Sequence, residues 1–178
     1  MPSPPPSSPL VRVVLTGAES TGKTTLAKRL AEHYDTVWLP EYVRFYVEEN
    51  GMTTYEDIPR IAEGYLKQER QLLPHAHRLA IYDTDLISNY LYSHHFFDRC
   101  PAWIEQASYD RKADLYLLAG DEIPWVADPG QRANPEIRAT LQEQFREELE
   151  RRDIPYIPLH GAVATRLETA ITAIDALL

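Results

Sequence analysis

The segment that most constrains this chain is residues 17–24, whose sequence GAESTGKT fits the pattern G-x-x-x-x-G-K-[ST] at every position. The two glycines let the backbone wrap closely, so that successive N–H groups point inward at an anion. Lys23 adds a cation for the β- and γ-phosphates of a nucleotide, and the Thr24 hydroxyl is a ligand for Mg²⁺. We therefore predict a site for ATP, or a similar nucleoside triphosphate, made by Gly17, Ala18, Glu19, Ser20, Thr21, Gly22, Lys23, Thr24 and Thr25.

The surroundings of this segment support the prediction. Residues 10–16 (LVRVVLT) are short, apolar and β-branched, as expected of a buried parallel strand, and residues 23–34 have the apolar spacing of a helix. A helix that begins at the loop directs the positive end of its dipole at the same site. The motif does not separate kinases from ATPases or motors. The absence of an N-K-x-D pattern disfavours a GTPase.

The rest of the chain alternates short apolar runs with amphipathic segments. The pattern predicts an α/β fold, with a five-stranded parallel sheet that helices cover on both faces. Two prolines in the last apolar run suggest that it lies at an edge of the sheet, and the proline-rich residues 120–135 are expected to form a loop. Further strands are predicted at 37–39, 79–82, 113–118 and 154–159, and further helices at 41–50, 53–78 (either continuous or broken), 86–97, 135–152 and 163–178.

Length and composition limit the remaining choices. The 178 residues suit one domain over residues 10–178, preceded by a disordered Pro/Ser tail at 1–9. The net charge of −9 argues against nucleic acid as the main partner, and no apolar run approaches the length of a membrane span. The single cysteine, Cys100, favours a cytoplasmic location. The oligomeric state stays open.

Charged residues follow the predicted second and third strands. Asp83 is placed to hold Mg²⁺ together with Thr24, because ligands of parallel sheets bind beyond the carboxyl ends of the strands. Asp85 either contacts a substrate hydroxyl or caps the next helix. Glu41 is a candidate proton acceptor or sugar ligand, and Arg44, one turn later, is a candidate phosphate contact. The alternative for these two residues is a surface ion pair.

Arginines and aromatic residues complete the predicted site. Arg132 and Arg138, in the loop and at the start of the following helix, are candidates to close over a triphosphate as a lid, with Arg132 the better placed. Trp125 and Asp128 lie in the same loop. Tyr42 and Tyr65 are candidates to contact a flat ring, although most of the tyrosines are expected to be core residues.

Five segments together resemble those of a known family: GAESTGKTTLAKRLA, PEYVRFY, YDTDLISNYLY, WVADPGQR and DIPYIPLHG. The resemblance is to the ribosylnicotinamide kinase domain of NadR-type NAD-salvage proteins, within a group of AAA-like small P-loop kinases, and it covers nearly the whole chain. It implies a nucleoside-monophosphate-kinase-like core with a lid, and transfer of phosphate from ATP·Mg²⁺ to the 5′-hydroxyl of nicotinamide riboside. Lys23 and Thr24 would then hold ATP and Mg²⁺, Glu41, Asp83 and Asp85 would serve metal and nucleoside, and Arg132 and Arg138 would belong to the lid.

Three positions depart from the family pattern. Pro40 stands where a ring-stacking tryptophan is expected, with Trp38 two residues earlier. Gln68 replaces an expected aromatic residue, with Tyr65 one turn away, and the lid has an extra residue at Pro129-Gly130. Two alternatives therefore stand beside a nicotinamide riboside kinase: a kinase of deoxynucleosides or other metabolites, and a regulatory ATPase switch.

Overall fold

A single parallel sheet organises the computed structural model, which describes residues 9–127 and 134–178. The strand order is β2-β3-β1-β4-β5, so β5 lies at an edge as its prolines indicate. The predicted five-stranded parallel sheet is therefore confirmed. The strands are β1 Val11–Thr16, β2 Val37–Leu39, β3 Leu79–Asp83, β4 Leu115–Ala119 and β5 Tyr156–Leu159.

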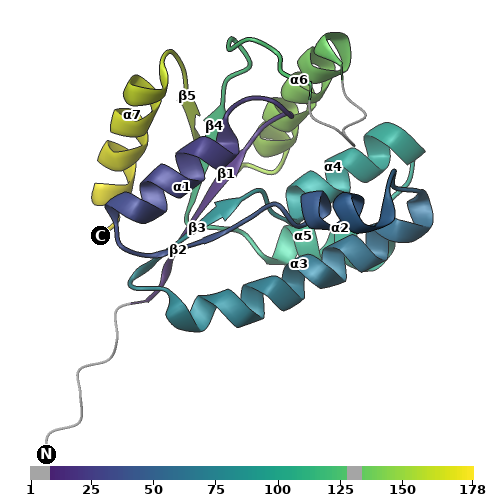
Figure 1. Ribbon diagram of the computed structural model, residues 1–178, viewed down its shortest axis with the longest axis horizontal. Coiled ribbons are helices and arrows are strands. Elements are labelled where there is room, and N and C mark those ends of the chain that lie inside the picture. The colour runs from purple at the N-terminus through teal and green to yellow at the C-terminus, as the bar shows by residue number, and fades with distance from the viewer. Residues whose placement is uncertain (1–8, 128–133) are drawn as a thin grey trace, which may run out of the picture.

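Helices cover both faces of this sheet, as expected (Figure 1). Helices α1 and α7 lie on one side, and α3, α4, α5 and α6 lie on the other. The helices are α1 Lys23–His33, α2 Tyr42–Asn50, α3 Ile58–Leu72, α4 Leu86–Phe97, α5 Ala102–Asp110, α6 Pro135–Arg151 and α7 Val163–Asp175, with short 3-10 turns η1 Tyr55–Asp57 and η2 Leu73–His75.

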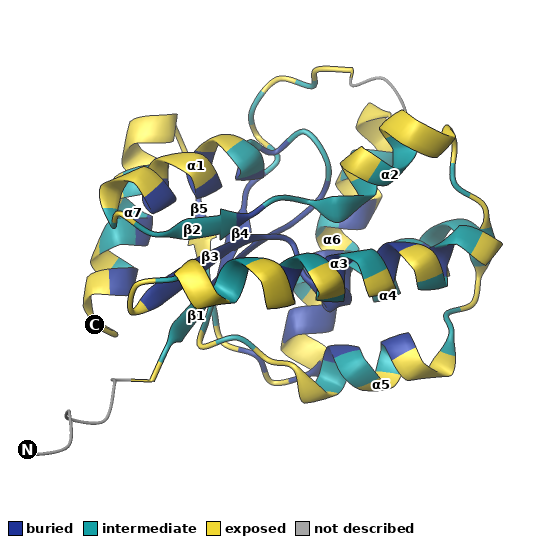
Figure 2. Cartoon of the chain, turned by 60° about the horizontal axis from the view of Figure 1, so that its bottom comes forward, coloured by how far each residue is buried: buried dark blue, intermediate teal, exposed yellow. Residues whose placement is uncertain are grey.

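Alternation along the central strand divides the core into two layers. Val13 and Leu15 of β1 pack with Leu26 and Leu30 of α1, whereas Val14 faces the opposite layer. Figure 2 shows the same division, because the buried stripes of the helices face the sheet. Burial of these apolar side chains is the main force that holds the helices to the two faces of the sheet.

The structure settles whether the predicted helical region 53–78 is broken, and it adds one helix that was not predicted. The region 53–78 is broken into η1, α3 and η2, with Pro59 in the first turn of α3 and Pro74 in η2. Helix α5 was not predicted at all. Only Ile104 and Ser108 of its residues are buried, so its sequence carries little periodic signal. Among the described residues, no helix is both long and apolar enough to cross a bilayer.

The topology places the glycine-rich loop beside the end of β3. Strand β1 lies between β3 and β4, and Leu15 is in register with Asp83. The loop after β1 and the carboxylate that ends β3 therefore meet at the same edge of the sheet. This edge is the usual ligand-binding position of open parallel sheets.

Candidate functional site

The loop between β1 and α1 has the backbone of a phosphate cradle. Gly17 and Gly22 have φ angles of 123° and 83°, a region that favours glycine. Gly17 also needs its lack of a side chain, because a Cβ there would lie 2.9 Å from the carbonyl oxygen of Ala119. Helix α1 begins directly after this loop, and the free N–H groups of its first turn are suited to bind an anion.

Three side chains gather at the start of α1. The Thr24 hydroxyl donates to Oδ2 of Asp83 at 2.5 Å, and Nζ of Lys23 donates to the carbonyl oxygen of Ala18 at 2.6 Å. Lys23 and Asp83 are buried, with 7% and 1% of their surface exposed. Thr25, which follows Thr24 in α1, is exposed. A buried cation held beside main-chain amides is suited to a polyphosphate.

Burial, and next the nearby charge of Glu41, raise the pKa of Asp83 to about 6, while Lys23 and the Thr24 hydrogen bond oppose that rise. Its buried Oδ1 atom has no hydrogen-bond partner among the described residues. A hydroxyl and a spare carboxylate oxygen are hard oxygen ligands that fit Mg²⁺. Residues 9–127 and 134–178 contain no group of three or more His, Cys, Asp or Glu side chains that could hold a metal ion.

A cavity opens beside this cluster, between α2, α3 and α4. Its empty volume is about 1070 Å³, which includes open solvent at its mouth. Aromatic and aliphatic side chains form most of its wall, and charged or polar groups lie among them. The lining residues include Glu19, Glu41, Tyr42, Val43, Arg44, Val47, Glu48, Ile58, Ile61, Tyr65, Thr84, Ser88, Asn89, Tyr92, Phe96 and Phe97.

Four of the predicted substrate residues therefore lie together: Glu41, Tyr42, Arg44 and Tyr65 all line the cavity. Glu41 precedes the first turn of α2, and Nε of Arg44 donates to its Oε2 atom at 3.1 Å. The suggested Glu41–Arg44 ion pair thus exists, and it lies at the wall of the cavity.

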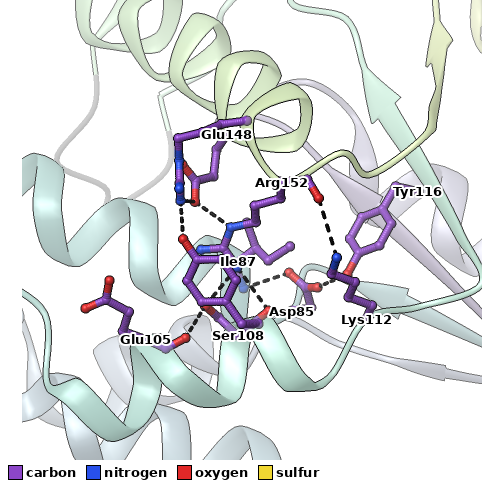
Figure 3. Close-up of polar contacts among 10 residues, drawn as sticks. Asp85, Ile87, Glu105, Ser108, Lys112, Tyr116, Glu148 and Arg152 are labelled. Atoms are coloured by element: carbon purple, nitrogen blue, oxygen red, sulfur yellow. Dashed lines mark hydrogen bonds and ion pairs between the residues drawn. The ribbon is translucent and has the colours of Figure 1, made fainter.

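Asp85 has the capping role that the sequence left as one of two possibilities. Its Oδ1 accepts from the Ile87 amide at 3.0 Å at the start of α4, and its Oδ2 accepts from the Tyr116 hydroxyl at 2.8 Å. Figure 3 shows this carboxylate turned toward Tyr116 of β4. Asp85 is buried and is not among the residues that line the cavity beside the loop, so the geometry does not bring it to a substrate there.

The described part of the predicted lid contacts the phosphate loop. Nη1 of Arg138 donates to the carbonyl oxygens of Ser20 and Ile123, at 3.2 and 3.0 Å, and its guanidinium lies 5.7 Å from the Trp125 ring centroid. The Val126 amide donates to the Ser20 hydroxyl at 3.0 Å. Arg132 and Asp128 lie outside the described residues.

The contacts of Trp38 and Gln68 show what these residues do near the two positions where the family pattern has an aromatic residue. Trp38 belongs to the core layer of α1, where Nζ of Lys28 lies 5.3 Å from its ring, so Trp38 does not replace the expected stacking residue. Nε2 of Gln68 donates to the Pro40 carbonyl oxygen at 2.7 Å and fixes the start of α2. Tyr42, Phe96 and Phe97 instead supply rings to the cavity.

Sequence reasoning missed several residues at this site. Gln142 of α6 accepts from the Ala18 amide and donates to the Ala119 carbonyl oxygen, both at 2.9 Å. Arg166 of α7 donates to the Thr21 carbonyl oxygen at 2.9 Å. Ser88, Asn89 and Phe97 line the cavity from α4. The aromatic composition of α4 was a usable signal for Phe97, whereas no local pattern marks Gln142 or Arg166.

A profile of the AAA domain family matches residues 12–166. The chain belongs to this AAA domain family. The AAA domain is also similar to curated proteins. The trifunctional NAD biosynthesis/regulator protein NadR of Escherichia coli K12 is 27% identical over 151 residues, which are 82% of this chain and 37% of that protein. The protein of the same name from Salmonella typhimurium LT2 is 29% identical over 121 residues, 65% of this chain and 30% of that protein. The chain thus spans about a third of the length of these relatives.

Solved structures show the same fold. A crystal structure of NadR protein in complex with NR has a TM-score of 0.80 at 24% identity, and covers 94% of this chain and 49% of that chain. Deoxyadenosine kinase from M. mycoides with products bound has a TM-score of 0.61 at 14% identity, over 93% of this chain and 100% of that chain. Thymidylate kinase from Ehrlichia chaffeensis has a TM-score of 0.64 at 14% identity, over 94% of this chain and 98% of that chain. The AAA domain therefore has a nucleoside-monophosphate-kinase-like fold.

Proposed function

We propose that this protein is an ATP-dependent kinase that phosphorylates the 5′-hydroxyl of nicotinamide riboside to give nicotinamide mononucleotide. The observation that carries the proposal is the lining of the cavity, which includes Glu19 of the phosphate loop, Thr84, the residue after Asp83, and Glu41, whose charge acts on Asp83. An acceptor in this cavity would face a triphosphate held by the loop at residues 17–24. The similarity to NadR, one structure of which is in complex with NR, supports the choice of acceptor.

The transfer follows from this arrangement. The 5′-oxygen of the acceptor attacks the γ-phosphorus of ATP, the bond to the β–γ bridging oxygen breaks, and ADP leaves. We assign to the Glu41 carboxylate the role of accepting the proton of the attacking hydroxyl. Lys23 and the main-chain amides of the loop stabilise the charge on the transferring group. Thr24 and Asp83 would hold Mg²⁺, which neutralises phosphate charge when bound, and Arg132 and Arg138 are proposed lid contacts.

The charge of the cavity favours a cationic acceptor. Glu19, Glu41 and Glu48 are its acidic lining residues and Arg44 is its basic one. The pyridinium ring of nicotinamide riboside carries a positive charge, and aromatic faces such as those of Tyr42 and Phe97 attract cations. Neutral nucleosides gain neither interaction.

The test is a panel of acceptors with ATP and Mg²⁺, in which ADP is measured and the product is identified by mass. We expect nicotinamide riboside to exceed thymidine and deoxyadenosine in kcat/KM by about tenfold or more, the effect of one favourable cation contact. A preference for a deoxynucleoside would support the second kinase hypothesis, which the likeness to deoxyadenosine kinase favours. ADP formation that no nucleoside increases would support the ATPase switch instead.

Glu48→Gln tests the choice of a cationic acceptor separately. Because the variant removes a negative charge from the cavity, its KM for nicotinamide riboside should rise severalfold, while its KM for a neutral nucleoside should not change. Glu49→Gln is the matched control, since Glu49 is the exposed neighbour that does not line the cavity. Equal effects on charged and neutral acceptors would contradict the electrostatic argument.

A further inference from the structure

One arginine of the last helix joins three loops at the edge of the sheet. Arg166 of α7 is only 1% exposed. Its Nη1 donates to the Thr21 carbonyl oxygen at 2.9 Å, its Nε donates to the Gly161 carbonyl oxygen at 2.9 Å, and its Nη2 donates to the Gly120 carbonyl oxygen at 3.2 Å. These carbonyl groups belong to the phosphate loop, the loop after β5 and the loop after β4. A planar guanidinium offers several donors in a fixed geometry, as this position requires.

Glu122 completes the cluster. Its Oε1 accepts from Nη2 of Arg166 at 2.7 Å and from the Gly161 amide at 2.7 Å. Burial alone would raise the pKa of Glu122, but hydrogen bonds from main-chain amides and from Arg166 lower it. Gly120 leaves room for this carboxylate, because a Cβ at Gly120 would lie 2.1 Å from Oε2 of Glu122. The cluster is therefore a closely fitted arrangement between distant segments.

The hydrogen bond to Thr21 has a consequence for phosphate binding. A trans peptide group is planar, so its C=O and N–H bonds point in opposite directions. Arg166 holds the Thr21 carbonyl on the side of the loop that faces α7, and thereby directs the Gly22 N–H to the opposite side. Gly22 is the residue before α1, where main-chain N–H groups are the expected phosphate donors.

We propose that Arg166 is a positioning residue of the nucleotide site, and that Glu122 holds its guanidinium in place. Arg166 fixes the orientation of the phosphate loop before the nucleotide arrives, so less conformational freedom is lost on binding. The same two residues tie the loop to the start of the lid segment after β4. This inference rests on the nucleotide binding of the proposed function but not on the identity of the acceptor.

The test measures the Kd of ATP directly by calorimetry, with Mg²⁺ and without acceptor. Arg166→Lys keeps the charge but cannot make all of these bonds, and we expect its Kd to rise by about tenfold or more, as loss of charge-assisted bonds predicts. Glu122→Gln should raise the Kd severalfold. Glu168→Gln changes an exposed glutamate of the same helix and should leave the Kd unchanged.

A kinase assay separates a positioning role from a general structural defect. A positioning role raises KM for ATP and leaves KM for the acceptor unchanged, and Arg166→Met should be more impaired than Arg166→Lys. A general structural defect does not predict this pattern. Wild-type affinity in a folded Arg166→Lys protein would overturn the inference. If that variant does not fold, Glu122→Gln decides, because Glu122 is 41% exposed at its side chain and tolerates the change. Tight ATP binding without turnover of nicotinamide riboside would refute only the proposed acceptor.

Discussion

At the scale of single residues, the site is a set of opposing charges held in a small space. Asp83 is buried beside Lys23 and close to Glu41, and burial and Glu41 raise the pKa of Asp83 to about 6. A cation that binds at its spare oxygen would relieve this unfavourable charge, and Lys23 would be released from the Ala18 carbonyl oxygen to meet a phosphate. The residues are thus arranged for ligands that carry both signs of charge.

Replacement of Lys23 tests this arrangement. Lys23→Met should lower kcat/KM for ATP by about 10²- to 10³-fold, because the variant loses a buried donor to the transferring phosphate. Lys28→Met is the control, since Lys28 is an exposed lysine of the same helix that lies over Trp38. Steady-state kinetics with varied ATP measure both. Unchanged turnover in Lys23→Met would contradict the assignment of the phosphate loop.

At the scale of elements, α3 shapes the cavity through one glycine. Gly64 lies in α3, and a Cβ there would lie 2.0 Å from Cε1 of Tyr42. The missing side chain lets the Tyr42 ring pack directly on the helix. This position explains a glycine in a helix interior, where alanine would stabilise the helix by about 1 kcal/mol.

Gly64→Ala should therefore displace the Tyr42 ring and change the cavity wall. We expect KM for the acceptor to rise about tenfold, the effect of losing one ring contact of about 1.4 kcal/mol, while KM for ATP stays constant. Glu63→Ala makes a comparable change at the exposed neighbouring position of α3 and should alter neither constant. Kinetics with each substrate varied in turn give the answer, and a rise in both constants would argue against this local explanation.

A buried ion pair at the end of α6 is hydrogen-bonded to α5. Nε of Arg152 donates to Oε1 of Glu148 at 2.5 Å, and Nη1 of Arg152 donates to the carbonyl oxygen and the hydroxyl of Ser108, both at 3.0 Å (Figure 3). Burial alone would raise the pKa of Glu148, but hydrogen bonds from Arg151 and Arg152 lower it below 4.5. Breaking such a pair leaves a buried charge without its partner.

Glu148→Gln should lower the free energy of unfolding at pH 7 by about 3 kcal/mol. Because the pKa of Glu148 is lower in the folded than in the unfolded protein, its contribution is complete above the unfolded pKa of about 4.5 and is lost as pH falls through the folded pKa. Urea unfolding at pH 7 and at about pH 3 should therefore show a difference from wild type that shrinks in acid. Glu147→Gln, at an exposed position, should cause no such loss. A difference that persists in acid would point to packing rather than charge.

At the scale of the whole molecule, the site exists only because the sheet brings distant segments to one edge. The phosphate loop follows β1, Asp83 ends β3, and Gln142 and Arg166 reach the loop from α6 and α7. The parallel register of β1 with β3 and β4 fixes these distances. The nucleotide site is therefore a property of the assembled layers rather than of the motif alone.

Much of the fold and of the candidate site could be predicted from the sequence, because local patterns were sufficient. The glycine-rich motif identified the loop, the alternation of apolar runs gave the parallel sheet, and the prolines of β5 indicated its edge position. Helix α5 escaped prediction since only Ile104 and Ser108 of its residues are buried. Glu41 and Asp83 could be placed near the site, because each follows the carboxyl end of a strand.

By itself, the sequence determined the phosphate loop and the layered fold, since both depend on neighbouring residues and on the period of apolar side chains. Only the tertiary structure decided that Asp85 caps α4 and contacts Tyr116, that Trp38 packs under α1, and that Tyr42 and Phe97 wall the cavity. These roles depend on which face of an element meets a partner far away in the chain. Arg166 is the clearest case, because its contact with Thr21 spans 145 residues and leaves no local pattern.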